Sequence, residues 1–176
     1  MAADALHARI APIKLAVFDV DGVLTDGSLV YGANGEEVKI FNTLDGHGLK
    51  MLQASGVVLA IISGRQSQAL ARRSSDLAIT HLMMGVDDKR VAFEKLLASL
   101  SLAPEQVAGL GDDVIDLPFL IRCGFAACVP TAPSIVKSRV HYVTTALGGR
   151  GAAREFCELI MREQGTLDAA LNRYLA

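Results

Sequence analysis

Short runs of β-branched and other apolar residues alternate along this chain with segments in which apolar residues recur every three or four positions. This alternation is typical of an α/β protein, a doubly wound parallel sheet with helices on both faces. The first run, residues 14–20, is apolar on both faces, as expected for a central strand. The predicted strands span residues 14–20, 57–62, 81–84, 107–110, 125–129 and 142–144. The predicted helices span residues 47–54, 67–77, 90–100, 115–122, a short segment after Pro133, 152–162 and 167–174.

The segment after the first strand has a different pattern. Two β-prone runs, 29–31 and 38–41, flank the sequence Gly32-Ala33-Asn34-Gly35. Asn-Gly between two such runs predicts a β-hairpin at about residues 29–41. No repeat, low-complexity stretch or linker interrupts the pattern, so we expect a single domain over 1–176, with a C-terminal helix and tail from about 148 to 176.

Composition and charge limit the function classes. The 176 residues are 51% hydrophobic and 20% charged, which is the balance of an ordinary globular protein, and the net charge of −2 gives no basic field for nucleic acid. The longest strongly apolar run, 57–62, is far shorter than the ~20 residues of a membrane span, and residues 1–13 lack an apolar signal core. Three cysteines match no zinc or redox spacing, so they are expected to be buried thiols. We therefore expect a cytoplasmic protein that binds neither nucleic acid nor membrane.

Carboxylates, a serine and a lysine follow the predicted strands. Open α/β sheets place their active sites at the carboxyl ends of the strands, where these side chains would converge. A lone Asp after a strand is usually a helix cap or a turn former, and a lone Lys is usually solvated. These residues are Asp19 and Asp21 after the first strand, Ser63 after the second, Lys89 after the third, and Asp112, Asp113 and Asp116 after the fourth.

Five carboxylates in two clusters are hard to explain as caps, because like charges repel when they are brought together. A divalent cation removes that cost, and hard oxygen ligands favour Mg²⁺. Phosphoryl transfer suits this set, since its transition state needs positioning and charge neutralisation. Asp19 would attack phosphorus and form an aspartyl-phosphate. Asp21, two residues further along an extended chain, would act as general acid and base, while Ser63 and Lys89 would bind phosphoryl oxygens.

The quoted residues carry a family resemblance. The set Asp19-x-Asp21-Gly22-Val23, Ser63-Gly64-Arg65, Lys89 and Gly111-Asp112-Asp113-x-x-Asp116 resembles the four ordered motifs of the haloacid dehalogenase superfamily. Residues 14 to about 165 are similar to one branch, the 3-deoxy-D-manno-octulosonate 8-phosphate phosphatases, including Gly148-Gly149-Arg150-Gly151 near the end. The resemblance implies a haloacid dehalogenase-like Rossmannoid fold in which a small β-hairpin stands in place of a cap domain.

Site roles follow from this resemblance. Asp19 and Asp112 would give side-chain oxygens to Mg²⁺ and Asp21 its backbone carbonyl, with Asp113 and Asp116 in support. The family often carries Arg where this chain has Leu44. Arg65 and Arg73 would share one helix face if their helix began at Arg65. The implied substrate contacts are Asp21, Asn42, Thr43, Leu44, Asp45, Gly46, Lys50, Arg65, Arg73, Lys89 and Arg150.

The resemblance also implies a substrate and an assembly. The substrate would be a sugar-acid phosphate, first of all 3-deoxy-D-manno-octulosonate 8-phosphate, in lipopolysaccharide precursor synthesis. Members of the branch are usually homotetramers with active sites at subunit interfaces. Gly148 and Gly149 would let the tail fold over a ligand, and Arg150 would then meet the carboxylate of the substrate.

Three alternatives stay open. One is a phosphatase for a nonulosonate 9-phosphate of the sialic acid type, in which an acidic residue can stand where this chain has Arg150. Another is a phospho-accepting receiver domain, although there the acidic pair precedes the acceptor Asp, and here the proposed nucleophile Asp19 comes first. The third is an idle member that only assembles with a partner, which the complete motif set disfavours.

Overall fold

The computed structural model describes residues 2–33 and 37–175, and its centre is a six-stranded parallel sheet. The strand order is β5-β4-β1-β6-β7-β8, so β1 lies between β4 and β6 in the middle of the sheet. The predicted parallel α/β architecture is confirmed. The strands are β1 (Leu15–Phe18), β4 (Val58–Ile62), β5 (His81–Met83), β6 (Val107–Gly111), β7 (Phe125–Cys128) and β8 (Tyr142–Val143).

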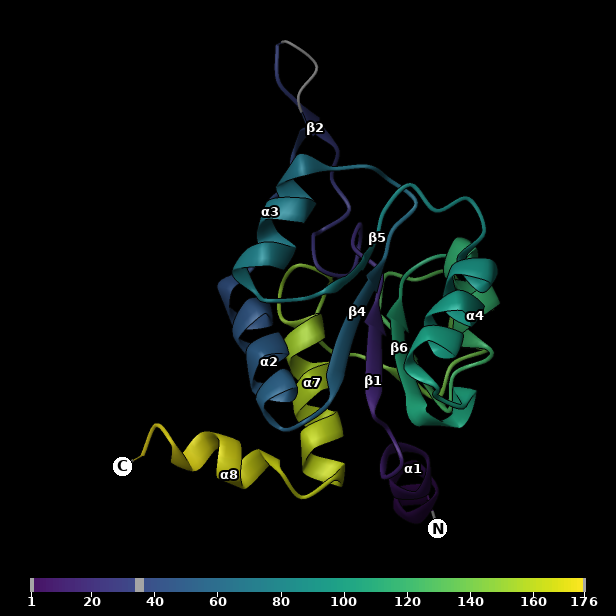
Figure 1. The fold of residues 1–176 in the computed structure, drawn as a ribbon, viewed down its shortest axis with the longest axis vertical. Coiled ribbons are helices and arrows are strands. Elements are labelled where there is room, and N and C mark those ends of the chain that lie inside the picture. Colours follow the sequence, from purple (N-terminus) through teal and green to yellow (C-terminus); the bar gives the residue numbers. More distant parts are fainter. Residues whose placement is uncertain (1, 34–36, 176) are drawn as a thin grey trace.

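Helices cover both faces of this sheet. Helices α2, α3 and α7 lie on one side and α4 on the other (Figure 1). None of the helices in the described residues has the length and apolar character needed to cross a membrane. The helices are α1 (Ala2–Ile10), α2 (Thr43–Ala54), α3 (Gln68–Asp76), α4 (Lys89–Leu100), η1 (Pro104–Gln106), η2 (Val114–Asp116), α5 (Leu117–Leu120), α6 (Ser134–Lys137), α7 (Ala152–Glu163) and α8 (Leu167–Asn172).

The core forms where α7 packs on the middle of the sheet. All four residues of β1 are completely buried, which accounts for its uninterrupted apolar sequence. Phe156 of α7 contacts Phe18 edge-on at 5.6 Å between ring centroids and stacks on Phe125 at 5.7 Å. Each fully buried Phe contributes about 1.5–3 kcal/mol to folding. The three cysteines are buried and free, as predicted.

A two-stranded antiparallel hairpin projects beyond the end of the sheet, in the region where a hairpin was predicted (Figure 1). It consists of β2 (Val30–Tyr31) and β3 (Glu37–Val38), in which Tyr31 lies opposite Glu37. The predicted Asn34-Gly35 turn lies outside the described residues. Both chain ends lie at the opposite end of the molecule.

Four elements differ from the predictions. Helix α2 begins at Thr43 rather than at 47, because the Asn42 side chain caps it. The predicted helix over 115–122 is divided into η2 and α5. Helix α3 begins at Gln68 after the N-cap Ser67, so Arg65 precedes the helix and the condition for a helix face shared by Arg65 and Arg73 is not met. Helix α1 was not predicted.

Candidate active site

Asp19, Asp112 and Asp116 form a three-aspartate cluster where β1 and β6 end side by side. The chain order reverses between these strands, which is where open α/β sheets have their crevice. Asp19 follows β1, and its N–H donates to the Leu110 carbonyl of β6 at 3.0 Å. Asp112 follows β6, and Asp116 closes the next turn. One carboxylate oxygen from each of the three aspartates lies within 4.8 Å of the others. The structure therefore joins the two acidic clusters of the sequence.

Lys89 lies between two of these carboxylates. It is the first residue of α4, whose N-cap is Asp88. Its ammonium nitrogen is 2.5 Å from an oxygen of Asp19 and 2.5 Å from an oxygen of Asp116, and its side chain is almost completely buried. A buried ammonium is tolerated only when it is paired in this way.

Asp116 holds the loop after β6 rather than pointing into open space. Its side chain is 0% exposed, and one oxygen accepts from the backbone N–H groups of Asp112 and Asp113 at 2.9 and 3.3 Å. The other oxygen contacts Lys89. This arrangement is the one expected of a supporting residue. The side chain of Asp113 is different: it is exposed and accepts from the N–H of Val114 at 2.7 Å. Its backbone contacts Asp116, through its N–H and through its carbonyl, which accepts from the Asp116 N–H at 3.0 Å.

The electrostatics of this cluster call for a cation. Burial, followed by the nearby charges of Asp19, Asp116 and Asp113, raises the pKa of Asp112 to about 8. Burial and the Asp116 charge likewise raise the pKa of Asp19 to about 7, against the opposing effect of Lys89. A single lysine does not offset the crowded carboxylates. Oxygen donors at this spacing, with excess negative charge, fit a hard divalent cation.

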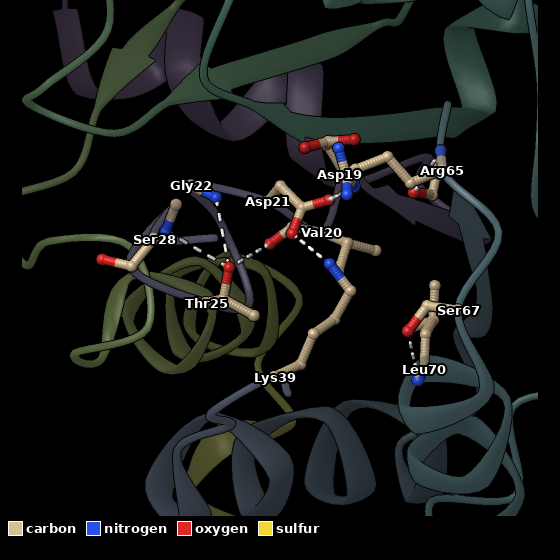
Figure 2. Close-up of polar contacts among 12 residues, drawn as sticks. Asp19, Val20, Asp21, Gly22, Thr25, Ser28, Lys39, Arg65, Ser67 and Leu70 are labelled. Atoms are coloured by element: carbon tan, nitrogen blue, oxygen red, sulfur yellow. Dashed lines mark hydrogen bonds and ion pairs between the residues drawn. The ribbon is translucent and has the colours of Figure 1, made fainter. Parts of the chain in front are cut away.

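Asp21 points away from this cluster toward the hairpin. The ammonium group of Lys39, which follows β3, bonds to one oxygen of Asp21 (Figure 2). The Arg65 guanidinium lies 3.9 Å from the other oxygen. Sequence reasoning missed Lys39. The sequence feature that could have identified Lys39 is its position as the only charged residue between Val38 and Ile40 in a β-prone run. In an extended strand its side chain would lie on the opposite face from those two apolar side chains.

Ser63 lies where predicted, at the end of β4. It is buried, and its hydroxyl oxygen accepts from the N–H of Arg65 at 3.3 Å. Strand β4 pairs with β1 in parallel register, with Ile61 opposite Phe18, so Ser63 stands on the strand beside Asp19. Arg65 then extends to the hairpin and donates to the Tyr31 hydroxyl at 2.8 Å.

Known proteins share this organisation. A haloacid dehalogenase-like hydrolase model matches residues 73–154. The 3-deoxy-D-manno-octulosonate 8-phosphate phosphatase of Yersinia pestis is 46% identical over 168 residues, covering 96% of this chain and 90% of that protein. The chain belongs to this phosphatase family.

Solved structures of the family agree with the fold. The enzyme from Moraxella catarrhalis, in complex with magnesium, phosphate and 3-deoxy-D-manno-octulosonate, is 39% identical, with a TM-score of 0.95 over 97% of this chain and 98% of that one. The cobalt-bound enzyme from Haemophilus influenzae is 42% identical, with a TM-score of 0.88 over 92% and 94%. As a member of the octulosonate-phosphate phosphatase family, the chain is a phosphatase with a haloacid dehalogenase-like sheet.

The segment that the family resemblance assigned to substrate, 42–46, has mainly local contacts here. Asn42 caps α2 by accepting from the N–H groups of Leu44 and Asp45, and its amide donates to the Gly149 carbonyl at 3.2 Å. Thr43 and Leu44 are exposed at the start of α2 and are open to a ligand.

Asp45, predicted as a substrate contact, has a structural role within this chain. Its side chain is buried, and its two oxygens accept from the N–H groups of Gly151 and Arg154 at 3.1 and 2.9 Å. These N–H groups are unpaired donors at the start of α7, so Asp45 caps a helix from another element. Each oxygen of this carboxylate is therefore already engaged by a backbone N–H of α7 or its N-cap.

The remaining predicted cations are spread out in the single chain. Arg73 donates to the Asn42 carbonyl at 3.1 Å, lies over the Phe41 ring at 5.9 Å and packs against Gly46. Lys50 lies on the surface in a hollow between α2 and α8. The structure brings neither of them to the three-aspartate cluster through any contact described in this chain.

Arg150 also lies on the surface. Its side chain is 70% exposed and faces Asp26 at 3.9 Å. Gly148, two residues before it, lies against the backbone of another loop. A Cβ at Gly148 would lie 1.7 Å from the Gly22 carbonyl oxygen, so glycine is needed there for close packing against the loop after β1.

Proposed function

We propose that this chain hydrolyses 3-deoxy-D-manno-octulosonate 8-phosphate to the free sugar acid and phosphate, as a step that supplies lipopolysaccharide precursors. The observation that carries the proposal is the Asp19–Lys89–Asp116 contact beside Asp112, in a chain that is 46% identical to a phosphatase of that name. The Moraxella relative, whose structure holds magnesium, phosphate and the sugar acid, supports both the substrate and the metal.

Mg²⁺ would be held by side-chain oxygens of Asp19 and Asp112 and by the backbone carbonyl of Asp21. Asp116 would support this shell, through its bonds to the N–H groups of Asp112 and Asp113. The crowded carboxylates, with their raised pKa values, fit such a cation. When bound, it supplies positive charge against the charge of the phosphoryl group.

The residues of the chain would divide the reaction into two steps. An oxygen of Asp19 attacks phosphorus while the bond to the leaving sugar oxygen breaks, and Asp21 donates a proton to that oxygen. Water then attacks the aspartyl-phosphate, gives its proton to Asp21, and releases phosphate and free Asp19. The Ser63 hydroxyl and the Lys89 ammonium would hold the phosphoryl oxygens through both steps.

The active form is proposed to be a cytoplasmic homotetramer with active sites at subunit interfaces. Its support in this chain is the hairpin, whose exposed apolar side chains would be unfavourable in water without a partner. Arg150 and Lys50, both exposed and away from the three aspartates, would contact substrate only in such an assembly. The exposed side chains of the hairpin are Leu29, Val30, Tyr31, Val38 and Ile40.

Phosphate release from a panel of sugar phosphates, with Mg²⁺ and with chelator, tests the proposal. The octulosonate phosphate should exceed glucose 6-phosphate in kcat/KM by at least about tenfold, or about 1.4 kcal/mol. A nonulosonate 9-phosphate in the same panel would reveal the nine-carbon alternative. Asp19→Asn should abolish turnover, and stable phosphorylation without release would indicate a receiver domain. Equal rates on all substrates, or full activity without metal, would contradict the proposal.

A further inference from the structure

Lys39 is a buried charge that the proposed reaction has not yet used. Its side chain is 3% exposed, although it belongs to a hairpin that projects from the molecule. Its neighbours Val38 and Ile40 are 46% and 71% exposed. Successive side chains of an extended strand point to opposite sides, so Lys39 is the residue of this run that turns inward. Burial of a lysine is costly unless its charge is paired, and its partner is Asp21.

The hairpin reaches Asp21 directly through Lys39 and indirectly through Tyr31, which contacts Arg65. Lys39, next to β3, bonds to one carboxylate oxygen directly. Tyr31 of β2 accepts a hydrogen bond from Arg65, whose Nε lies 3.9 Å from the other oxygen. Figure 2 shows the Lys39 side chain extended toward the Asp21 carboxylate, with its ammonium group directed at it. Two cationic groups, both in contact with the hairpin, therefore face the same carboxyl group.

We infer that Lys39 is a positioning residue for Asp21, so that the hairpin forms part of the proton-transfer machinery. This inference rests on the proposed function, in which Asp21 gives a proton to the leaving sugar oxygen as the phosphorus–oxygen bond breaks, and takes one from water afterwards. Proton transfer requires the carboxyl group within about 3 Å of the reacting oxygen. The Lys39 bond fixes one oxygen of Asp21 and leaves the other facing the Arg65 guanidinium.

The leaving group of the substrate separates this role from a structural one. An alkyl oxygen, as in the sugar phosphate, leaves poorly without a proton, whereas 4-nitrophenolate leaves readily without one. Lys39→Met keeps the aliphatic stem and removes the charge. We expect kcat for the octulosonate phosphate to fall about 10–100-fold, within the range of general acid–base catalysis, with KM changed less than about threefold. For 4-nitrophenyl phosphate, kcat/KM, which reports the step that expels the leaving group and not the later hydrolysis of the aspartyl-phosphate, should fall less than about threefold, and Lys39→Arg should recover part of the loss on the sugar phosphate.

A double-mutant cycle with Asp21→Asn tests whether Lys39 acts through Asp21. In the Asp21→Asn background, Lys39→Met should change kcat less than about twofold, because the group that it positions is already gone. Lys95→Met, at an exposed lysine of α4, is the matched control and should behave as wild type. Thermal unfolding is used to check that each variant is folded. If Lys39→Met does not fold, Lys39→Arg is compared with wild type on the octulosonate phosphate and on 4-nitrophenyl phosphate instead.

Three results would overturn the inference. A raised KM with unchanged kcat would make Lys39 a substrate contact. Equal losses of kcat/KM on both substrates would make its role structural. Full additivity with Asp21→Asn would separate Lys39 from Asp21. Failure of the proposed function is distinguishable, because it would appear in the wild-type protein as absent turnover of the sugar-acid phosphate.

Discussion

Lys89 is the cation that pairs with two buried carboxylates at the end of β1. Its removal leaves buried carboxylates of Asp19 and Asp116 without a partner, which costs about 3–5 kcal/mol in comparable buried pairs. We expect Lys89→Met to lower turnover at least about 100-fold, because it also removes positive charge from the phosphoryl site. Thermal unfolding and phosphate release measure the two losses. Mg²⁺ should restore part of the stability but not the turnover, and turnover within twofold of wild type would contradict the assignment.

Asp112 should make the stability of the metal-free protein depend on pH. Its pKa is raised to about 8 in the folded protein, from an ordinary value of 3.8. Between these values the folded state binds more protons than the unfolded state, so stability falls as pH rises from about 4 and the loss is complete above about 8. The melting temperature of the chelated protein should therefore decrease over this window.

Two comparisons check the origin of that decrease. Asp112→Asn should flatten the decrease, because an amide does not titrate. Saturating Mg²⁺ should reduce it as well, since the cation favours the ionised carboxylates. A metal-free profile that rises from pH 6 to pH 8 would mean that the carboxylates of this cluster do not carry the raised pKa values.

At the residue scale, sequence motifs predicted the cluster but not every role in it. Asp19, Asp112 and Lys89 were predictable because their chemistry requires those residue types at strand ends. The structure alone shows that Asp45 is a helix cap, since its donors lie more than 100 positions away along the chain. Lys39 was missed for a similar reason, because its partner Asp21 is 18 positions away, across the hairpin.

At the scale of elements, α2 and α7 are joined by the Asp45 carboxylate and by close packing at Gly48. A Cβ at Gly48 would lie 2.9 Å from the Cα of Arg154, so the two helices approach closely there. Asp45→Ala would leave the N–H groups of Gly151 and Arg154 without acceptors. We expect a loss of about 1–3 kcal/mol in unfolding free energy. This corresponds to roughly 2–4 °C in melting temperature per kcal/mol.

Kinetics distinguish this structural role from the substrate contact that the resemblance implied for Asp45. The folded fraction of Asp45→Ala should keep KM for the sugar-acid phosphate within about twofold of wild type. Asp45→Asn, which retains one oxygen acceptor, should lose less stability than the alanine variant. A normal melting temperature and a raised KM in Asp45→Ala would instead indicate that Asp45 contacts the substrate.

The bounds of an element could be predicted from the sequence where burial requires a run of apolar residues. They could not be predicted where one capping side chain determines the residue at which a helix begins. The central strands β1, β4 and β6 are buried, so their apolar runs identify them to within a few residues. The start of α2 depends on one Asn42 side chain, and the helix therefore began four residues before its apolar pattern. Helix α1 has a weak apolar pattern. It is fixed by Gln164, the residue that ends α7, whose side-chain amide donates to the carbonyls of Ile10 and Ile13. That support comes from the far end of the sequence.

At the scale of the whole molecule, the strand order decides which motifs meet. The sequence predicts parallel strands, but the order β4-β1-β6 is a property of the tertiary fold. That order places the ends of β1 and β6 side by side and so unites Asp19 with Asp112, which are far apart along the chain. The same geometry leaves Arg150 and Lys50 on the surface of a single chain, and their proposed contacts with substrate depend on assembly.

The hairpin should therefore control both assembly and substrate choice. Ile40 is 71% exposed and belongs to an apolar surface formed by both strands of the hairpin, which a partner copy would cover. Ile40→Glu places a charge on that surface, and burying it in an interface would cost several kcal/mol. We expect light scattering to show a shift from the mass of four chains to that of one chain of 18.6 kDa. Turnover of the sugar-acid phosphate should fall at least about tenfold with dissociation, while a small aryl phosphate, which does not reach across subunits, should keep most of its rate.

Ile121→Glu, at an apolar residue that is 55% exposed on another part of the surface, is the control and should remain assembled. If Ile40→Glu stayed a tetramer, or became a monomer with full activity on the sugar acid, the active site would be complete within one chain.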